Sequence, residues 1–133
     1  MGSEMCIRDR IKMRYGLPVM KAVGISSESD LDKVKSFFEV CDQILFDAKP
    51  ANRHALPGGN GVQFDWSILS NRSWSKPWML AGGLNASNVQ TAVKLTNAKQ
   101  LDLSSSVELS PGIKDATKMK NFMQALDNCN FGN

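Results

Sequence analysis

Short apolar segments and longer amphipathic segments alternate along most of the chain. Four of the apolar segments are bounded by proline, glycine, serine or polar residues, a pattern typical of buried parallel strands, which need not alternate in polarity. They are residues 19–25 (VMKAVGI), 43–49 (QILFDAK), 77–83 (PWMLAGG) and 100–106 (QLDLSSS). The pattern therefore predicts four strands, each followed by a helical segment.

The helical segments show apolar residues at three- and four-residue spacing, which predicts one apolar face on each. The first begins at Ser27, where Asp30 resembles a capping box, and two later ones begin after the capping residues Asn85 and Asp115. Residues 64–69 (FDWSIL) indicate only a short helical turn. The three faces are Leu31, Val34, Phe37 and Phe38; Val89, Ala92, Val93, Leu95 and Thr96; and Met119, Phe122, Met123 and Leu126.

Four strand–helix units predict one α/β domain, either a small doubly wound sheet or part of a (β/α)₈ barrel. The chain has 133 residues, 42% of them apolar and 22% charged, as in ordinary globular domains. A net charge of +3 gives no indication of nucleic-acid binding, and no apolar run is long enough to span a membrane. Three cysteines without a CxxC pattern and a single histidine predict a cytoplasmic protein with no disulfide and no multi-histidine metal site.

Residues 1–10 (MGSEMCIRDR) show neither an apolar period nor a capping pattern, and we expect them to be a non-native leader; the alternative is a native, frayed N-terminus. The domain is then expected over residues 11–126, with a tail over residues 127–133. Cys6, which lies in the leader, is given no functional role.

Polar residues gather at the carboxyl ends of the predicted strands, where both architectures bind ligands. Asp47 follows Ile44, Leu45 and Phe46, and burial among them would raise the pKa of its carboxyl group, as a general acid requires. The alternative is an aspartate that caps a loop or pairs with Lys49.

Asp102 lies between two leucines and could orient a substrate amine or hydroxyl, or form a structural ion pair with Lys21 or Lys99. Gly82–Gly83 and Ser104–Ser106 end two consecutive strands. Small residues there let backbone N–H groups approach an anion, so these turns predict a phosphate site.

The segment between Pro50 and Gly61 exceeds the usual ~2–6 residues of a βα connection and is either a lid over the site or ordinary surface. His54 within it is interpreted as a solvated loop histidine. Trp66, Trp74 and Trp78 are expected to pack in the helix layer.

The motifs FDAKP, PGGNGVQFDWSIL, PWMLAGGLNASNV and LDLSSSVELSPGIKD, in this order and spacing, resemble phosphoribosylanthranilate isomerase over about residues 11–126. The resemblance implies a (β/α)₈ TIM barrel of tryptophan biosynthesis, of which about four C-terminal βα units are expected here. It also implies an Amadori rearrangement of N-(5-phosphoribosyl)anthranilate, a phosphorylated small-molecule substrate, to 1-(2-carboxyphenylamino)-1-deoxyribulose 5-phosphate, with no cofactor.

The resemblance assigns the family's general acid to Asp47 and the aspartate near the anthranilate amine to Asp102. Its phosphate-binding turns match Gly82 and Gly83 and, one unit later, Ser104, Ser105 and Ser106. Ser106 stands where the family usually has glycine, and it still offers its backbone N–H unless the position needs a positive φ.

The family's general base, a strand-1 cysteine, precedes the matched region, and Cys6, Cys41 and Cys129 do not match its position. We therefore expect a half barrel that is inactive alone and self-associates through unpaired strand edges. The alternatives are a silent phosphate-binding half barrel, a half-enzyme completed by a second chain, and another phosphate-handling barrel such as indole-glycerol-phosphate synthase, against which the FDWS and GGLN motifs argue.

Overall fold

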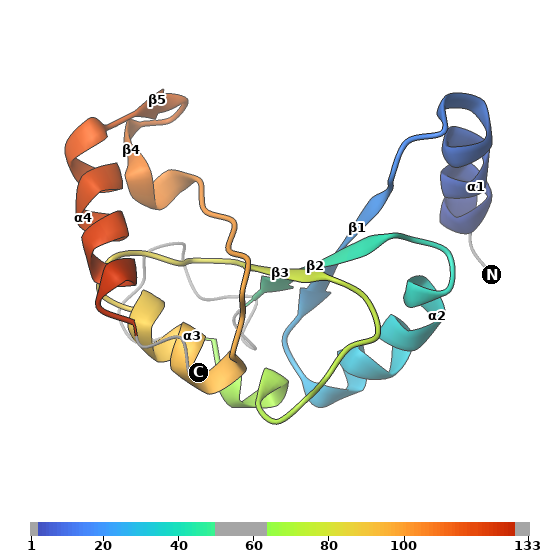
Figure 1. The fold of residues 1–133 in the computed structure, drawn as a ribbon, viewed down its shortest axis with the longest axis horizontal. Helices are drawn as coiled ribbons and strands as arrows, with labels where there is room; N and C mark the ends of the chain where they lie inside the picture. The colour runs from blue at the N-terminus through green and yellow to red at the C-terminus, as the bar shows by residue number, and fades with distance from the viewer. Residues whose placement is uncertain (1–2, 50–63, 130–133) are drawn as a thin grey trace.

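A parallel sheet forms the centre of the molecule in a computed structural model that describes residues 3–49 and 64–129 (Figure 1). Its strands β1 (Met20–Ile25), β2 (Gln43–Ala48) and β3 (Trp78–Ala81) lie side by side in chain order. The first three predicted strands are therefore confirmed. Chain order is also the strand order of a (β/α)₈ barrel, whereas a doubly wound sheet reverses its order at one point.

The fourth predicted strand, residues 100–106, is wrong as a continuous strand. It contributes one parallel bridge from Leu101 to Leu80 of β3, with two backbone hydrogen bonds of 2.9 and 2.8 Å. Beyond Asp102 the chain turns into the 3₁₀ helix η3 (Ser105–Val107). Serine is a residue that favours turns, and here the Ser104 hydroxyl donates to the carboxylate of Glu108, which follows the turn (3.3 Å). The segment still takes the fourth place in the sheet.

In the described part of the chain, α2 and α3 cover one face of the sheet. In Figure 1, α2 and α3 lie on the same side of it, and the opposite side is open. The helical elements that follow β1 are η1 (Glu28–Lys33), α2 (Val34–Phe38), η2 (Trp66–Leu69), α3 (Val89–Thr96) and α4 (Ala116–Asp127). None of the helices in the described part of the chain is long and apolar enough to cross a membrane.

The two faces of the sheet differ in burial. Ile44, Phe46 and Leu80 point to the helices and are fully buried. The ring centre of Phe46 lies 5.0 Å from that of Trp74 and 5.4 Å from that of Trp78. Trp66 is buried, and Trp74 and Trp78 pack against the same core, so the predicted role of the three tryptophans is confirmed.

The open face carries a row of small and apolar residues. Ala22, Leu45 and Met79 are register partners across the three strands, and they are half-buried or exposed. A sheet of a parallel α/β protein is normally covered on both faces. This row is therefore apolar surface that another layer could cover.

Ser27 and Asp115 are N-caps as predicted, whereas the prediction that Asn85 caps the next helix is wrong, because the N-cap of α3 is Asn88. The carboxylate of Asp30 accepts hydrogen bonds from the backbone N–H groups of Ser26 (2.9 Å) and Ser27 (3.1 Å), which lower its pKa. Asn85 caps the turn that precedes α3, and Asp115 accepts from the backbone N–H of Thr117 (3.2 Å) at the start of α4. The helix predicted from Ser27 begins as η1 and continues as α2.

Several features differ from the sequence expectations. Leu95, Met119 and Met123 lie on predicted buried faces but are exposed, because little packs over those parts of α3 and α4. The hairpin of β4 (Glu108–Ser110) and β5 (Ile113–Lys114) was not predicted, and neither was α1 (Ser3–Tyr15), which stands apart from the sheet in Figure 1. The predicted loop between Pro50 and Gly61, with His54, falls outside the described residues.

Candidate functional site

A cavity of about 230 Å³ opens at the carboxyl ends of β2, β3 and the bridged segment. Parallel strands bring their carboxyl ends to one edge of the sheet, so residues distant in sequence meet there. All seven residues predicted as a site line this cavity: Asp47, Gly82, Gly83, Asp102, Ser104, Ser105 and Ser106. The structure thus brings the whole predicted set together, although it does not test what each residue does.

Asp47 lies in β2 on the open face, between Gly24 of β1 and Ala81 of β3. The burial expected of its carboxyl group is wrong, since the side chain is 40% exposed. The sequence segment is apolar, but its flanking side chains Ile44 and Phe46 point to the opposite face. The ammonium of Lys49 lies 3.8 Å from the Asp47 carboxylate, and this exposed pair contributes little to stability.

Gly82 ends β3 in a conformation that requires glycine. Its φ is +98°, and a Cβ atom there would lie 2.6 Å from the backbone N of Ala48. Gly83 also has a positive φ, +65°, but a Cβ there would meet open space. The Asn88 amide fixes the turn by donating to the carbonyl of Gly83 (2.8 Å). Gly82 therefore lets the end of β3 approach the end of β2 closely, which shapes the cavity.

The serine turn is held from outside the cavity by the hairpin of β4 and β5. The Ser104 hydroxyl donates to Glu108 Oε1 (3.3 Å), and Lys114 donates to the carbonyl of Ser104 (3.1 Å). The backbone N–H of Gly112, followed by nearby Lys114, lowers the pKa of Glu108. Glu108 and Lys114 thus position the turn, a role that the sequence analysis missed. The turn dipeptide Pro111–Gly112 is the signal that could have revealed the hairpin.

Ser106 occupies its position without backbone strain. Among the described residues, the non-glycine residues with positive φ are Asn71 and Asn97. The backbone of Ser106 therefore does not demand the glycine that the resemblance leads one to expect there. Its hydroxyl oxygen is buried and makes no hydrogen bond within the described chain.

Asp102 is exposed at the rim of the cavity. Of the two lysines considered as its partners, Lys99 donates to Asn97 Oδ1 (3.3 Å) and Lys21 lies 5.3 Å from the ring centre of Phe37. A carboxylate at this rim is accessible to a ligand amine or hydroxyl.

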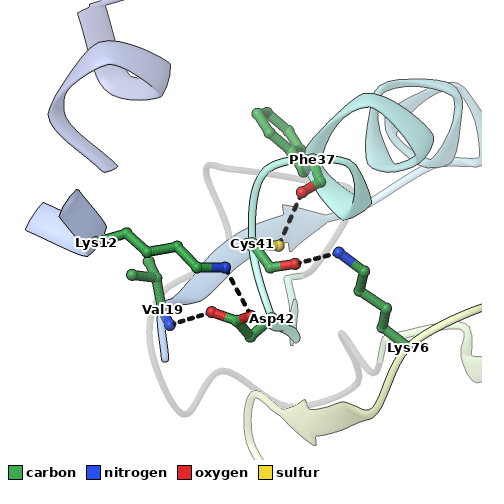
Figure 2. Close-up of polar contacts among 6 residues, drawn as sticks. All are labelled: Lys12, Val19, Phe37, Cys41, Asp42 and Lys76. Atoms are coloured by element: carbon green, nitrogen blue, oxygen red, sulfur yellow. Dashed lines mark hydrogen bonds and ion pairs between the residues drawn. The ribbon is translucent and has the colours of Figure 1, made fainter. Parts of the chain in front are cut away.

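Cys41 and Cys129 do not line the cavity. Cys41 is buried before β2, at the opposite end of the strand, where its thiol donates to the carbonyl of Phe37 (2.8 Å; Figure 2). Cys129 follows α4 and is half-buried. In the part of the chain that the structure describes, no group of three or more His, Cys, Asp or Glu residues is arranged to hold a metal ion.

Parallel strands in chain order, with glycine and serine turns and two carboxylates at their carboxyl ends, are the features of an α/β protein of the (β/α)₈-barrel kind. A family model described as N-(5'-phosphoribosyl)anthranilate (PRA) isomerase matches residues 2–125. The chain therefore belongs to the N-(5'-phosphoribosyl)anthranilate isomerase family. The match includes most of the segment 1–10 that the sequence analysis set aside.

Curated relatives of the chain bear the name of this family. The chain is 54% identical over 114 residues to the N-(5'-phosphoribosyl)anthranilate isomerase of Cereibacter sphaeroides, covering 86% of this chain and 54% of the relative. It is 51% identical over 117 residues to that of Paramagnetospirillum magneticum, covering 88% of this chain and 54% of the relative. The chain thus spans about half the length of the curated relatives that it matches.

Solved structures agree with this placement. The phosphoribosyl anthranilate isomerase of Thermotoga maritima superposes with a TM-score of 0.74 at 34% identity, over 96% of this chain and 58% of that one. A phosphoribosyl anthranilate isomerase in complex with reduced 1-(o-carboxyphenylamino)-1-deoxyribulose 5-phosphate gives a TM-score of 0.70 at 33% identity, over 96% and 55%. The solved relatives, like the curated ones, extend well beyond the matched region.

Proposed function

We propose that residues 11–126 form the fifth to eighth βα units of a phosphoribosylanthranilate isomerase barrel and supply its general acid and phosphate site. The observation that carries this proposal is the single cavity lined by all seven residues that the family resemblance assigns. The strand order and the superposition on the Thermotoga maritima enzyme support it.

Asp47 is the proton donor in this proposal. Its carboxylic acid gives a proton to the furanose ring oxygen while the anthranilate nitrogen donates electrons to C1, so that the C1–O bond breaks and the ring opens. The carboxylate left behind stays within reach of Lys49. A general acid in this position contributes ~10²–10⁴-fold to the rate.

The remaining residues bind and orient the substrate. The turns at Gly82–Gly83 and Ser104–Ser106 receive the 5-phosphate, which preorganised backbone N–H groups bind without a lysine. Asp102, at the exposed rim, lies near the anthranilate amine. The base that removes the C2 proton, a strand-1 cysteine in the family, comes from another part of a complete barrel in this proposal.

A two-chain assay tests the proposed function. The 133-residue chain is co-expressed with a second chain carrying the first four βα units of a relative, and isomerisation of N-(5-phosphoribosyl)anthranilate is measured. We expect the pair to turn over at least ~10³-fold faster than the chain alone, because the base and the anthranilate contacts are then present. Full activity of the chain alone contradicts the proposal, and an assembled pair that binds phosphate without turnover indicates the silent half barrel.

We further propose that the chain alone associates with a second copy through the open face of its sheet. In the described residues, β1 pairs only with β2, and the segment around Leu101 pairs only with β3, so two parallel edges lack partners. Two copies related by a two-fold axis place each edge beside the other copy's opposite edge and close a ring. The row of Ala22, Leu45 and Met79 then faces the partner's row and is removed from water.

Sedimentation at micromolar concentration tests this association. We expect a dimer or larger species for the unmodified chain and a shift toward monomer for Met79→Lys, which puts a charge on the open face. Met123→Lys is the matched control, since Met123 is exposed on α4 away from the sheet. A sharp monomer boundary with cooperative unfolding of the unmodified chain contradicts the proposal.

A further inference from the structure

The hydroxyl of Ser106 is buried without a hydrogen-bond partner. In the described part of the chain, two other buried side-chain polar atoms share this state, the indole nitrogens of Trp66 and Trp74. Both indoles belong to or pack against the hydrophobic core, whereas Ser106 lines the candidate site. A buried polar group without a partner costs stability, so each such case calls for an explanation.

The neighbouring hydroxyl shows that partners are available in this turn. Ser104, two residues earlier, donates to the carboxylate of Glu108 at 3.3 Å. Ser106 makes no comparable contact within the described chain, although its backbone φ is not positive. The lack of a partner is therefore specific to the Ser106 side chain rather than to the turn.

Ser106 lies in the wall between two cavities. One is the cavity at the strand ends, and the other, of about 280 Å³, is bounded by the turn before α3 and by α4. Lys118 also lines the second cavity. Its ammonium cannot accept a hydrogen bond from the hydroxyl, and it already donates to the carbonyl of Glu108 (2.8 Å). A serine side chain changes rotamer about a single bond, χ1, so its hydroxyl can reach an acceptor in the first cavity without a movement of the backbone.

We propose that the Ser106 hydroxyl is a direct ligand of the substrate phosphate and donates a hydrogen bond to a phosphate oxygen when the first cavity is filled. The inference rests on the proposed function, which places the phosphate at this turn, and adds a side-chain contact to the backbone N–H groups. A phosphate dianion has three strong acceptor oxygens, and a hydrogen bond to a charged acceptor is roughly twice as strong as a neutral one. Within the described part of the free chain this donor has no partner, and in this proposal the phosphate supplies one.

Two measurements on the full chain test the proposal. The affinity for ribose 5-phosphate is measured by calorimetry, with ribose as the ligand without phosphate, and thermal unfolding is measured without ligand. Ser106→Ala and Ser106→Gly remove the hydroxyl, Ser106→Thr keeps it, and Ser110→Ala removes an exposed hydroxyl from the nearby hairpin as a control.

We expect Ser106→Ala to weaken ribose 5-phosphate binding by ~10-fold or more, since a hydrogen bond to a charged group is lost. Ser106→Thr should retain most of the affinity, and Ser110→Ala should match the unmodified chain. Without ligand, Ser106→Ala should unfold at the same temperature as the unmodified chain or higher, because it removes an unpaired buried hydroxyl. If the hydroxyl only stabilised the fold, its removal would instead lower the unfolding temperature.

The outcomes separate this inference from the proposed function. Equal affinity of Ser106→Ala and the unmodified chain overturns the hydroxyl contact and leaves the phosphate site standing. A lower unfolding temperature of Ser106→Ala without ligand, with equal loss of affinity in Ser106→Thr, shows a structural role and overturns the inference. No binding of ribose 5-phosphate by the unmodified chain overturns both.

Discussion

Both ends of the sheet carry polar groups, but in the described residues the acidic side chain at the amino end is held by more hydrogen bonds than the one at the carboxyl end. Asp42, just before β2, accepts hydrogen bonds from the backbone N–H of Val19 (2.7 Å) and from Lys12 (2.9 Å). Lys76 donates to the carbonyl of Cys41 (2.7 Å), and Figure 2 shows these contacts joined around the start of β2. The amino end thus connects α1, β1, β2 and the segment before β3.

At the carboxyl end, two polar side chains of the candidate site are less firmly held by the described residues. Asp47 has an exposed lysine at 3.8 Å, and the Ser106 hydroxyl has none among the described residues. Partnered polar groups stabilise a fold, whereas groups held beside a cavity without partners are free to bind a ligand. The comparison teaches that one strand, β2, links a structural end at Asp42 to a candidate chemical end at Asp47, five residues later.

The largest expected effect comes from replacing Asp47, the proposed general acid at the carboxyl end of the sheet. Asp47→Asn, in the two-chain enzyme, should lower kcat by ~10²–10⁴-fold, because the amide keeps the shape but cannot give up a proton to the ring oxygen. Thermal unfolding should change little, since the Asp47–Lys49 pair is exposed. A drop in kcat of less than about tenfold removes the acid role from Asp47.

The glycine pair gives a second, smaller test at the same end. Gly82→Ala should destabilise the chain by ~2–3 kcal/mol or more, because it combines a disfavoured backbone conformation with a collision against the Ala48 backbone. Gly83→Ala should cost only ~1 kcal/mol, since its conformation is left-handed but the space is open. Urea unfolding of both variants measures the difference. Equal losses would show that the close approach of β3 to β2 does not constrain this turn.

The sequence predicted the strands well because their apolar residues are also their core residues. Ile44 and Phe46 of β2 are buried against the helices, as a short apolar segment requires. The strand prediction failed at residues 100–106, where three serines favour a turn over a continued strand. Met119 and Met123 show a related limit, since helical periodicity identifies an apolar face but not whether anything covers it.

The site residues were predictable because parallel strands collect their carboxyl ends at one edge. The environments of these side chains were not predictable in the same way. The exposure of Asp47 depends on which face of β2 the helices cover, which its flanking residues alone do not reveal. The support of the serine turn by Glu108 and Lys114 depends on the short hairpin of β4 and β5, which apolar periodicity does not reveal and which the turn dipeptide Pro111–Gly112 alone indicates.

The smallest expected effect lies at the structural end, where Asp42 links β2 to Lys12 and Val19. The hydrogen bond from Lys12, followed by that from the backbone N–H of Val19, holds the pKa of the Asp42 carboxyl group below its ordinary value. A group with a lowered pKa in the folded state stabilises the fold above the pKa of the unfolded chain, about 4. That contribution is lost as the pH falls through the lowered, folded-state pKa.

Asp42→Asn should therefore lower the unfolding temperature slightly at pH 7 and make it less dependent on pH below about 4. The stabilisation that the Lys12–Asp42 ion pair contributes should decrease in high salt, because both side chains are partly exposed and their attraction is screened. Asp32→Asn, at an exposed position in η1, is the matched control and should follow the unmodified chain. Isomerase activity of the two-chain enzyme should stay unchanged in Asp42→Asn, in contrast to Asp47→Asn. If both variants lose activity equally, the division between a structural and a chemical end of the sheet is wrong.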